Sequence, residues 1–208
     1  MNSAIPILTL LLLCGCYSKP NLYIGAGGFG FGCGSNSPLA QQPYGMMRLG
    51  PDTTPPARKL YAAFQHFGGY NTGDHYLRGF SHMHLVGAGV LDLGILGVLP
   101  TKDKHPKAPE DRLIWFDKLQ EYAEPGYYKT LVEGGIQVEL TATLRAGVHR
   151  YTFDKGEMTL YFLTSNMLQK KNNRTAECTF VGNNSFEGKV FTMGSFSSRF
   201  GGLNTYYH

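Results

Sequence analysis

Residues 127–163, YYKTLVEGGIQVELTATLRAGVHRYTFDKGEMTLYFL, alternate apolar and polar side chains in short runs separated by glycine-containing or charged turns. Alternation with a period of two is typical of half-buried strands, and glycine and aspartate are typical of the turns between them. The expected strands are Tyr128–Val132, Ile136–Leu144, His149–Phe153 and Met158–Leu163. Their close spacing favours an antiparallel β-sandwich.

The same pattern continues on both sides of this stretch. We expect further strands at Ala176–Val181, Gly188–Ser195 and Leu203–Tyr207, one or two buried strands within His82–Val98, and a short strand at Tyr44–Leu49 that is closed by Gly50-Pro51-Asp52. Residues Leu113–Tyr122 are expected to form one or two helical turns. The sequence therefore predicts an all-β fold.

Composition supports a turn-rich β protein. The chain has 208 residues, of which 27 are glycine, 13 tyrosine and 13 phenylalanine, and only 16% are charged. The low charge argues against a disordered chain or a coiled coil. The net charge is +4, and the basic residues do not cluster into a stripe, so no nucleic-acid partner is expected.

The N-terminus indicates export. The apolar run Ile5–Leu13 is too short to span a membrane but fits the core of a secretory signal, so residues 1–19 are expected to be a signal peptide. Leu13-Cys14-Gly15-Cys16 also fits a lipoprotein signal with Cys16 as the lipid-bearing residue, the one expected route to a membrane. We expect a secreted, periplasmic or cell-surface protein. In such a compartment Cys33 and Cys178 could form a disulfide or remain two buried thiols.

Residues 21–35, NLYIGAGGFGFGCGS, contain too many glycines for the interior of a helix or strand. Gly25 to Gly30 matches G-x-G-x-x-G, but the following FGCGSNSPLAQQP cannot open the helix that a dinucleotide site needs. We interpret the stretch as a loop that lines a cleft, with a purely structural loop as the alternative.

Two histidines at an i, i+2 spacing, His82 and His84, would face the same side of a strand. With Asp92 nearby they could ligate zinc or iron, but the spacing alone is a weak signal; they could instead line a pocket or be structural. Upstream, Phe64, His66, Phe67, Tyr70 and Tyr76 place aromatic faces beside polar groups, a combination that suits sugar rings. Filling of a sandwich core is the alternative for these aromatics.

Several ordered motifs point to one family. They are NLYIGAGGFGFGCGSNSPLAQQPYGMMRLGPDTT at 21–54, GFSHMHL at 79–85, PGYY at 125–128, ELTAT at 139–143 and RAGVHRYTF at 145–153. Together they resemble the N-terminal domain of glycoside hydrolase family 92, the calcium-dependent exo-acting α-mannosidases. The resemblance covers nearly all of residues 20–208.

The resemblance implies a supersandwich of the galactose-mutarotase-like type, packed on a larger helical domain that holds the catalytic acid, the base and most calcium ligands. It implies mannose-containing glycans as substrates, including those of glycoproteins. By motif position, the residues expected to line the substrate pocket here are Ile24, Gly25, Gly27, Gly28, His66, His82 and His84. No catalytic residue and no metal ligand is expected within this chain.

Two departures from the family pattern matter. The segment Phe64–Tyr70 has no tryptophan, although family members often carry one there. The sequence ends at His208, before any helical domain, so we expect an N-terminal piece whose sandwich could be incomplete at its C-terminus. Such a chain should be inactive alone. A free-standing carbohydrate-binding module is the alternative interpretation.

Overall fold

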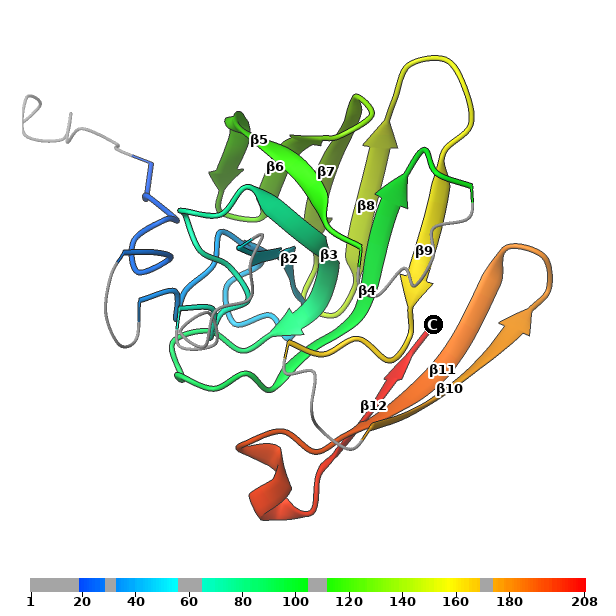
Figure 1. The fold of residues 1–208 in the computed structure, drawn as a ribbon. Helices are drawn as coiled ribbons and strands as arrows, with labels where there is room; N and C mark the ends of the chain where they lie inside the picture. Colours follow the sequence, from blue (N-terminus) through cyan, green and yellow to red (C-terminus); the bar gives the residue numbers. More distant parts are fainter. Residues whose placement is uncertain (1–18, 29–32, 56–64, 105–111, 169–173) are drawn as a thin grey trace, which may run out of the picture.

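A computed structural model describes residues 19–28, 33–55, 65–104, 112–168 and 174–208. These residues form two antiparallel sheets (Figure 1). The strands are β1 (Ala40–Gln41), β2 (Arg48–Thr54), β3 (Tyr76–His84), β4 (Leu93–Thr101), β5 (Ile114–Glu124), β6 (Tyr127–Val132), β7 (Ile136–Ala142), β8 (Gly147–Thr152), β9 (Thr159–Leu163), β10 (Arg174–Val181), β11 (Ser185–Thr192) and β12 (Leu203–Tyr207). Among the described residues, the helical element is a 3-10 turn at Ser197–Phe200.

The larger sheet has nine strands and encloses the main core. Its strands run in the order β1-β2-β3-β5-β6-β7-β8, and β4 and β9 extend it from β3. Apolar side chains from β1 to β7 meet in one buried cluster that includes Leu49, Phe80, Phe116, Tyr128 and Val138. The all-β, antiparallel fold class predicted from the sequence is confirmed.

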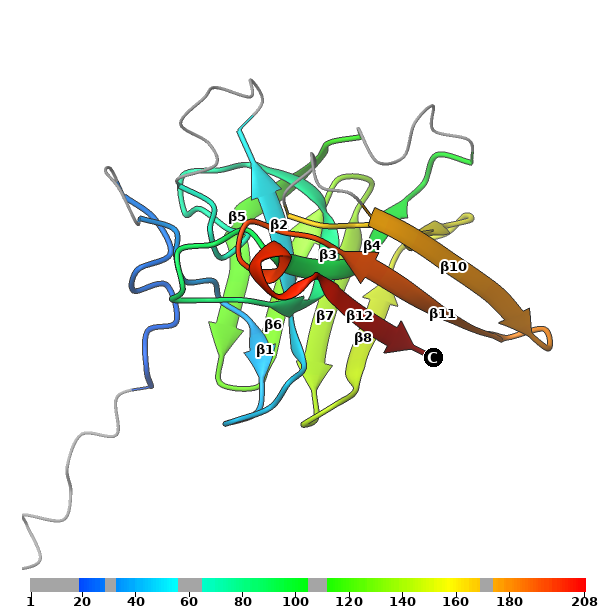
Figure 2. The ribbon, with the colours of Figure 1, turned by 90° about the horizontal axis from the view of Figure 1, so that it is seen from below.

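The smaller sheet consists of β10, β11 and β12 and lies beside β4, β8 and β9 (Figures 1 and 2). Most of its side chains face solvent, since residues 175–181 of β10 are all exposed. Phe186 of β11 connects the two sheets, because the centroid of its ring lies 4.8 Å from the centroid of the Phe162 ring on β9.

The helical turns expected at Leu113–Tyr122 are wrong, because all but the first of these residues belong to β5. This strand pairs with β3 at its start and with β6 along its length, and the β6 pairing shifts register between Asp117 and Tyr122. At the shift Leu119 is 94% exposed, whereas the Glu121 carboxylate points inward. Pairing with strands on both sides therefore decides the conformation here instead of the expected helical turns.

The inward carboxylate of Glu121 anchors a neighbouring loop. It accepts hydrogen bonds from the hydroxyls of Tyr70 and Tyr128, each at 2.8 Å, and from Lys118 Nζ at 2.9 Å. Lys118 Nζ also lies 4.3 Å from the centroid of the Tyr70 ring. These contacts fix residues 65–75, which carry the predicted site residue His66, against β5 and β6.

Further sequence predictions concern a turn, a disulfide and the N-terminal segment. Gly50, Pro51 and Asp52, expected to close a short strand, instead lie inside β2. No disulfide joins Cys33 to Cys178, and Cys178 is exposed on β10 rather than buried. The apolar run Ile5–Leu13 and Cys16 lie outside the described residues. Within the described residues, no helix is long and apolar enough to cross a membrane.

Candidate functional site

The glycine-rich loop is an ordered feature of the surface. Ile24 is 71% exposed, and Gly25 and Gly28 are exposed as well. The loop is held from behind, because the Gly25 carbonyl accepts hydrogen bonds from the backbone N–H groups of Gly34 at 3.1 Å and Asn36 at 3.2 Å. It therefore presents backbone to solvent in a fixed shape.

Gly27 is where the loop meets the segment that carries His66. A Cβ at Gly27 would lie 1.9 Å from Thr72 Oγ1, so a side chain cannot fit without a shift. The backbone N–H of Thr72 donates to the Ala26 carbonyl at 2.9 Å. Glycine at position 27 thus allows residues 24–28 to lie directly against residues 65–75.

His66 lies within this second segment and is 8% exposed. Its Nε2 is 2.5 Å from Asp74 Oδ2, a buried contact between the ring and a carboxylate. The structure thus brings four predicted residues of the loop and His66 onto adjoining segments. A cavity of about 230 Å³ lies beside the loop, and Leu22, Asn36, Gln42 and Pro43 are among the residues that line it.

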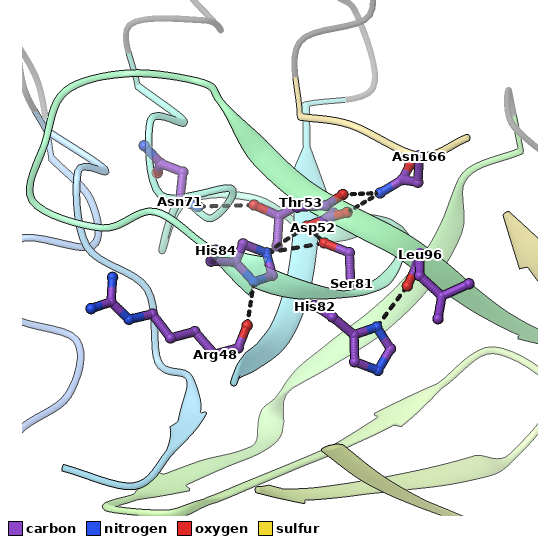
Figure 3. A network of polar contacts seen from close by, with 10 residues as sticks. Arg48, Asp52, Thr53, Asn71, Ser81, His82, His84, Leu96 and Asn166 are labelled. Atoms are coloured by element: carbon purple, nitrogen blue, oxygen red, sulfur yellow. Dashed lines mark hydrogen bonds and ion pairs between the residues drawn. The ribbon is translucent and has the colours of Figure 1, made fainter. Parts of the chain in front are cut away.

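His84 lies beneath these segments in a buried polar network (Figure 3). Its Nε2 is 2.7 Å from Asp52 Oδ1, and its Nδ1 is 3.0 Å from the Arg48 carbonyl. Both partners are hydrogen-bond acceptors, so a ring nitrogen of His84 that carries a proton donates to one of them.

Asp52 is the centre of this network. Its carboxylate also accepts hydrogen bonds from Ser81 Oγ at 2.8 Å and from Asn166 Nδ2 at 3.1 Å. A Cβ at Gly69 would lie 2.9 Å from the His84 ring, so this ring supports the segment that bears His66. His84 thus contacts the predicted pocket from below, and its side chain is fully buried.

His82 does not share the surroundings of His84, although both were expected on one side of a strand. The backbone of Met83 has φ +59°, and the pairing of β3 with β4 shifts register between Phe80 and His82. Regular alternation is therefore lost. The His82 Nδ1 donates instead to the Leu96 carbonyl of β4 at 2.7 Å.

Sequence reasoning missed His149, the partner of His82. The two Nε2 atoms are 3.1 Å apart, and His149 Nδ1 is 2.8 Å from the Tyr151 hydroxyl. Burial lowers the pKa of His82, and burial together with the nearby His82 lowers the pKa of His149 to about 3. The sequence signal that could have found this residue is the i, i+2 spacing of His149 and Tyr151, which places both side chains on one face of β8.

Asp92 lies elsewhere and does not complete a metal site with His82 and His84. It accepts hydrogen bonds from Ser195 Oγ at 3.1 Å and from the backbone N–H groups of Phe196 at 3.1 Å and Ser197 at 2.7 Å. Across the described part of the chain, no group of three or more His, Cys, Asp or Glu side chains is placed to hold a metal ion. The described residues therefore do not supply the carboxylate-rich ligand set that calcium prefers.

We expect the histidine pair to make stability depend on pH. A histidine whose pKa is lowered by folding binds a proton more readily when unfolded, so stability falls as the pH drops below about 6.5 and levels off near 3 for His149. Between pH 7 and pH 5 each histidine that stays neutral should cost about 2 kcal/mol. Urea unfolding in chelator-containing buffer measures this, and His149→Gln should flatten the dependence. An equal slope in both proteins would contradict the assignment.

Comparison with known proteins extends this picture. A profile of the glycosyl hydrolase family 92 N-terminal domain matches residues 21–208. The fold is similar to that of a family 92 α-mannosidase from Bacteroides thetaiotaomicron, with a TM-score of 0.68 and 24% identity over 84% of this chain and 23% of that one. A second family 92 glycosyl hydrolase gives a TM-score of 0.68 and 23% identity over 89% of this chain and 25% of that one.

A secreted glycosidase of Arthroderma benhamiae is 30% identical over 125 residues, which are 56% of this chain and 15% of that protein. The chain thus spans about a quarter or less of the length of these relatives. The solved structures share its fold, and the profile match extends over its two sheets. The chain belongs to glycosyl hydrolase family 92 and corresponds to the N-terminal domain of that family.

Proposed function

We propose that this chain is the N-terminal β-sandwich of an exo-acting α-mannosidase that acts on glycoprotein-type mannosides, and that it forms the non-catalytic wall of the sugar pocket. Family membership supports the reaction class, and the secreted fungal relative supports action outside the cell. The signal peptide at 1–19 and a lipid on Cys16 belong to the same proposal.

The observation that carries the proposal is the exposed backbone at Gly25 and Gly28 in the loop 24–28, which is fixed from behind. Sugar hydroxyls both donate and accept hydrogen bonds, and a backbone without side chains lets a ring approach closely. Because residues 34–36 and Thr72 already hold this loop, little conformational entropy would be lost when a sugar binds. His66 lies on the adjoining segment, where its buried ring contacts Asp74.

We place the catalytic acid and base outside this chain. Inverting glycosidases need two carboxyl groups about 6.5–9.5 Å apart that flank the scissile bond. The buried acids among the described residues already have protein partners: Asp52 with His84, Asp74 with His66, Asp92 with the segment at 195–197, and Glu139 with Arg150. Calcium is likewise proposed to bind mostly to residues of a helical domain beyond this chain.

The test is hydrolysis of an aryl α-mannoside in the presence of calcium. The chain alone should release no mannose above the buffer control, whereas a chimera that joins it to the helical domain of a family 92 α-mannosidase should be active. Robust calcium-dependent release by the 208-residue chain would contradict the proposal. Mannose binding by the isolated chain in calorimetry, with an inactive chimera, would instead favour a free-standing binding module.

The chimera also tests the loop. Gly28 has φ +117°, and a Cβ there would meet Cys33 Sγ at an ordinary contact distance of 3.5 Å, so Gly28→Ala should strain the exposed backbone and lower kcat/KM. Gly182→Ala is the matched control, since Gly182 also has a positive φ and no neighbour within 4 Å, but lies in the β10–β11 hairpin. Equal kcat/KM for the two variants would argue against a sugar-contacting loop.

A further inference from the structure

A cavity lies between parts of the two sheets. It has a volume of about 640 Å³ and lies between β12 and residues of β3, β4 and β8. Three methionines, Met46, Met47 and Met83, line it together with His82. A second cavity of about 350 Å³ is lined by both His82 and His149. The histidine pair therefore borders solvent-sized space that does not include the glycine-rich loop at 24–28.

The two rings face each other through their Nε2 atoms. Because His82 Nδ1 donates to the Leu96 carbonyl, a neutral His82 has its lone pair on Nε2. The proton between the rings then belongs to His149 Nε2, and His149 Nδ1 accepts from the Tyr151 hydroxyl. One shared proton thus lies between two nitrogens that are both good metal ligands.

We propose that His82 and His149 bind a divalent late transition-metal ion of the zinc type between their Nε2 atoms. Two imidazoles on a tetrahedral zinc ion, each about 2.05 Å from the metal, lie roughly 3.3 Å apart. The observed separation is 3.1 Å, so the rings need to move by only a few tenths of an ångström. Water or cavity groups complete the coordination, because the histidines border open space.

The outer contacts of both rings suit this role. Metal-binding histidines usually donate their second ring N–H to a carbonyl, carboxylate or hydroxyl oxygen, which fixes the ring orientation. His82 already donates to the Leu96 carbonyl. On metal binding, His149 moves its proton from Nε2 to Nδ1, which then donates to the Tyr151 oxygen.

This tautomer change releases no proton, because each imidazole keeps one N–H. Burial lowers the pKa of both histidines, so protons compete little with the metal at neutral pH. The donor set also separates this site from any calcium site, since calcium prefers oxygen ligands and zinc accepts imidazole nitrogen.

The experiment uses the whole chain after chelator treatment and gel filtration. Zn²⁺ is titrated by calorimetry, and Co²⁺ is titrated by visible absorption, which reports tetrahedral coordination. We expect one ion per chain, and at least about tenfold weaker binding in His149→Gln and in His82→Gln. Circular dichroism and thermal unfolding without metal check that each variant is folded.

His75→Ala is the matched control, because His75 is exposed and lies outside the pair. It should bind both ions as the unaltered chain does. His208→Ala tests one candidate third ligand, since His208 lines both cavities. Wild-type chain that binds neither ion overturns the proposal without reference to any variant, and so does binding that a folded His149→Gln chain retains unchanged.

Discussion

Replacing His84 with alanine is expected to lower the free energy of unfolding by about 3–5 kcal/mol, because it removes a buried hydrogen-bond partner of the Asp52 carboxylate and leaves a cavity in place of the ring. The side chain of His84 is 0% exposed and that of Asp52 is 2% exposed. Ser81 and Asn166 would still donate to Asp52, so the carboxylate loses one of three side-chain partners. Urea unfolding at pH 7, followed by circular dichroism, measures the loss.

A double-mutant cycle identifies the cause. Asp52→Ala should cost a similar amount, and the His84→Ala/Asp52→Ala double variant should cost clearly less than the sum of the two. If the two losses add, the pair is not coupled, and the cost of His84→Ala comes from the lost packing against Gly69 instead.

The second large effect is expected at Gly34, where a side chain cannot be accommodated. Its φ is +80°, and a Cβ would lie 1.7 Å from the backbone oxygen of Gln65. The atom in the way is backbone, so it cannot rotate aside. Gly34→Ala should therefore separate residues 33–37 from residues 65–69 and destabilise the protein by about 3 kcal/mol.

Gly135→Ala is the matched control for this prediction. Gly135 has φ +71° in the β6–β7 turn, with nothing within 4 Å of the added Cβ. It should cost only about 1 kcal/mol, the penalty of a left-handed conformation without a clash. Amide chemical shifts of residues 24–28 should change in Gly34→Ala and not in Gly135→Ala. Equal stability of the two variants would contradict the clash.

The parts of the fold that follow from local pattern were predictable. The β6–β7 hairpin combines strict alternation with two glycines at the turn, Gly134 and Gly135, and it forms where the sequence places it. The position of Asp52 was not predictable, because its partners His84 and Asn166 are 32 and 114 residues away. Gly50-Pro51-Asp52, a triplet typical of turns, lies inside β2, where those distant groups satisfy the Asp52 carboxylate.

The candidate site likewise has a part that the sequence predicts and a part that it does not. Glycine content alone identifies the loop at 24–28, since no regular element tolerates it. The separation of His82 from His84 depends on the left-handed backbone of Met83, which β4 imposes. The i, i+2 rule assumes an undistorted strand, and it fails where a register shift intervenes. The contribution of these residues to sugar binding stays a prediction.

The hydrogen bonds of Asp92 bear on the order in which the chain folds. The β10–β11–β12 sheet can form early, because its strands are neighbours in sequence. Its attachment through Asp92 joins residues 103 to 105 positions apart, so a long loop must close first. We therefore expect this sheet to join the rest last and to detach first. In native-state hydrogen exchange its amides would form a separate, less protected cooperative unit.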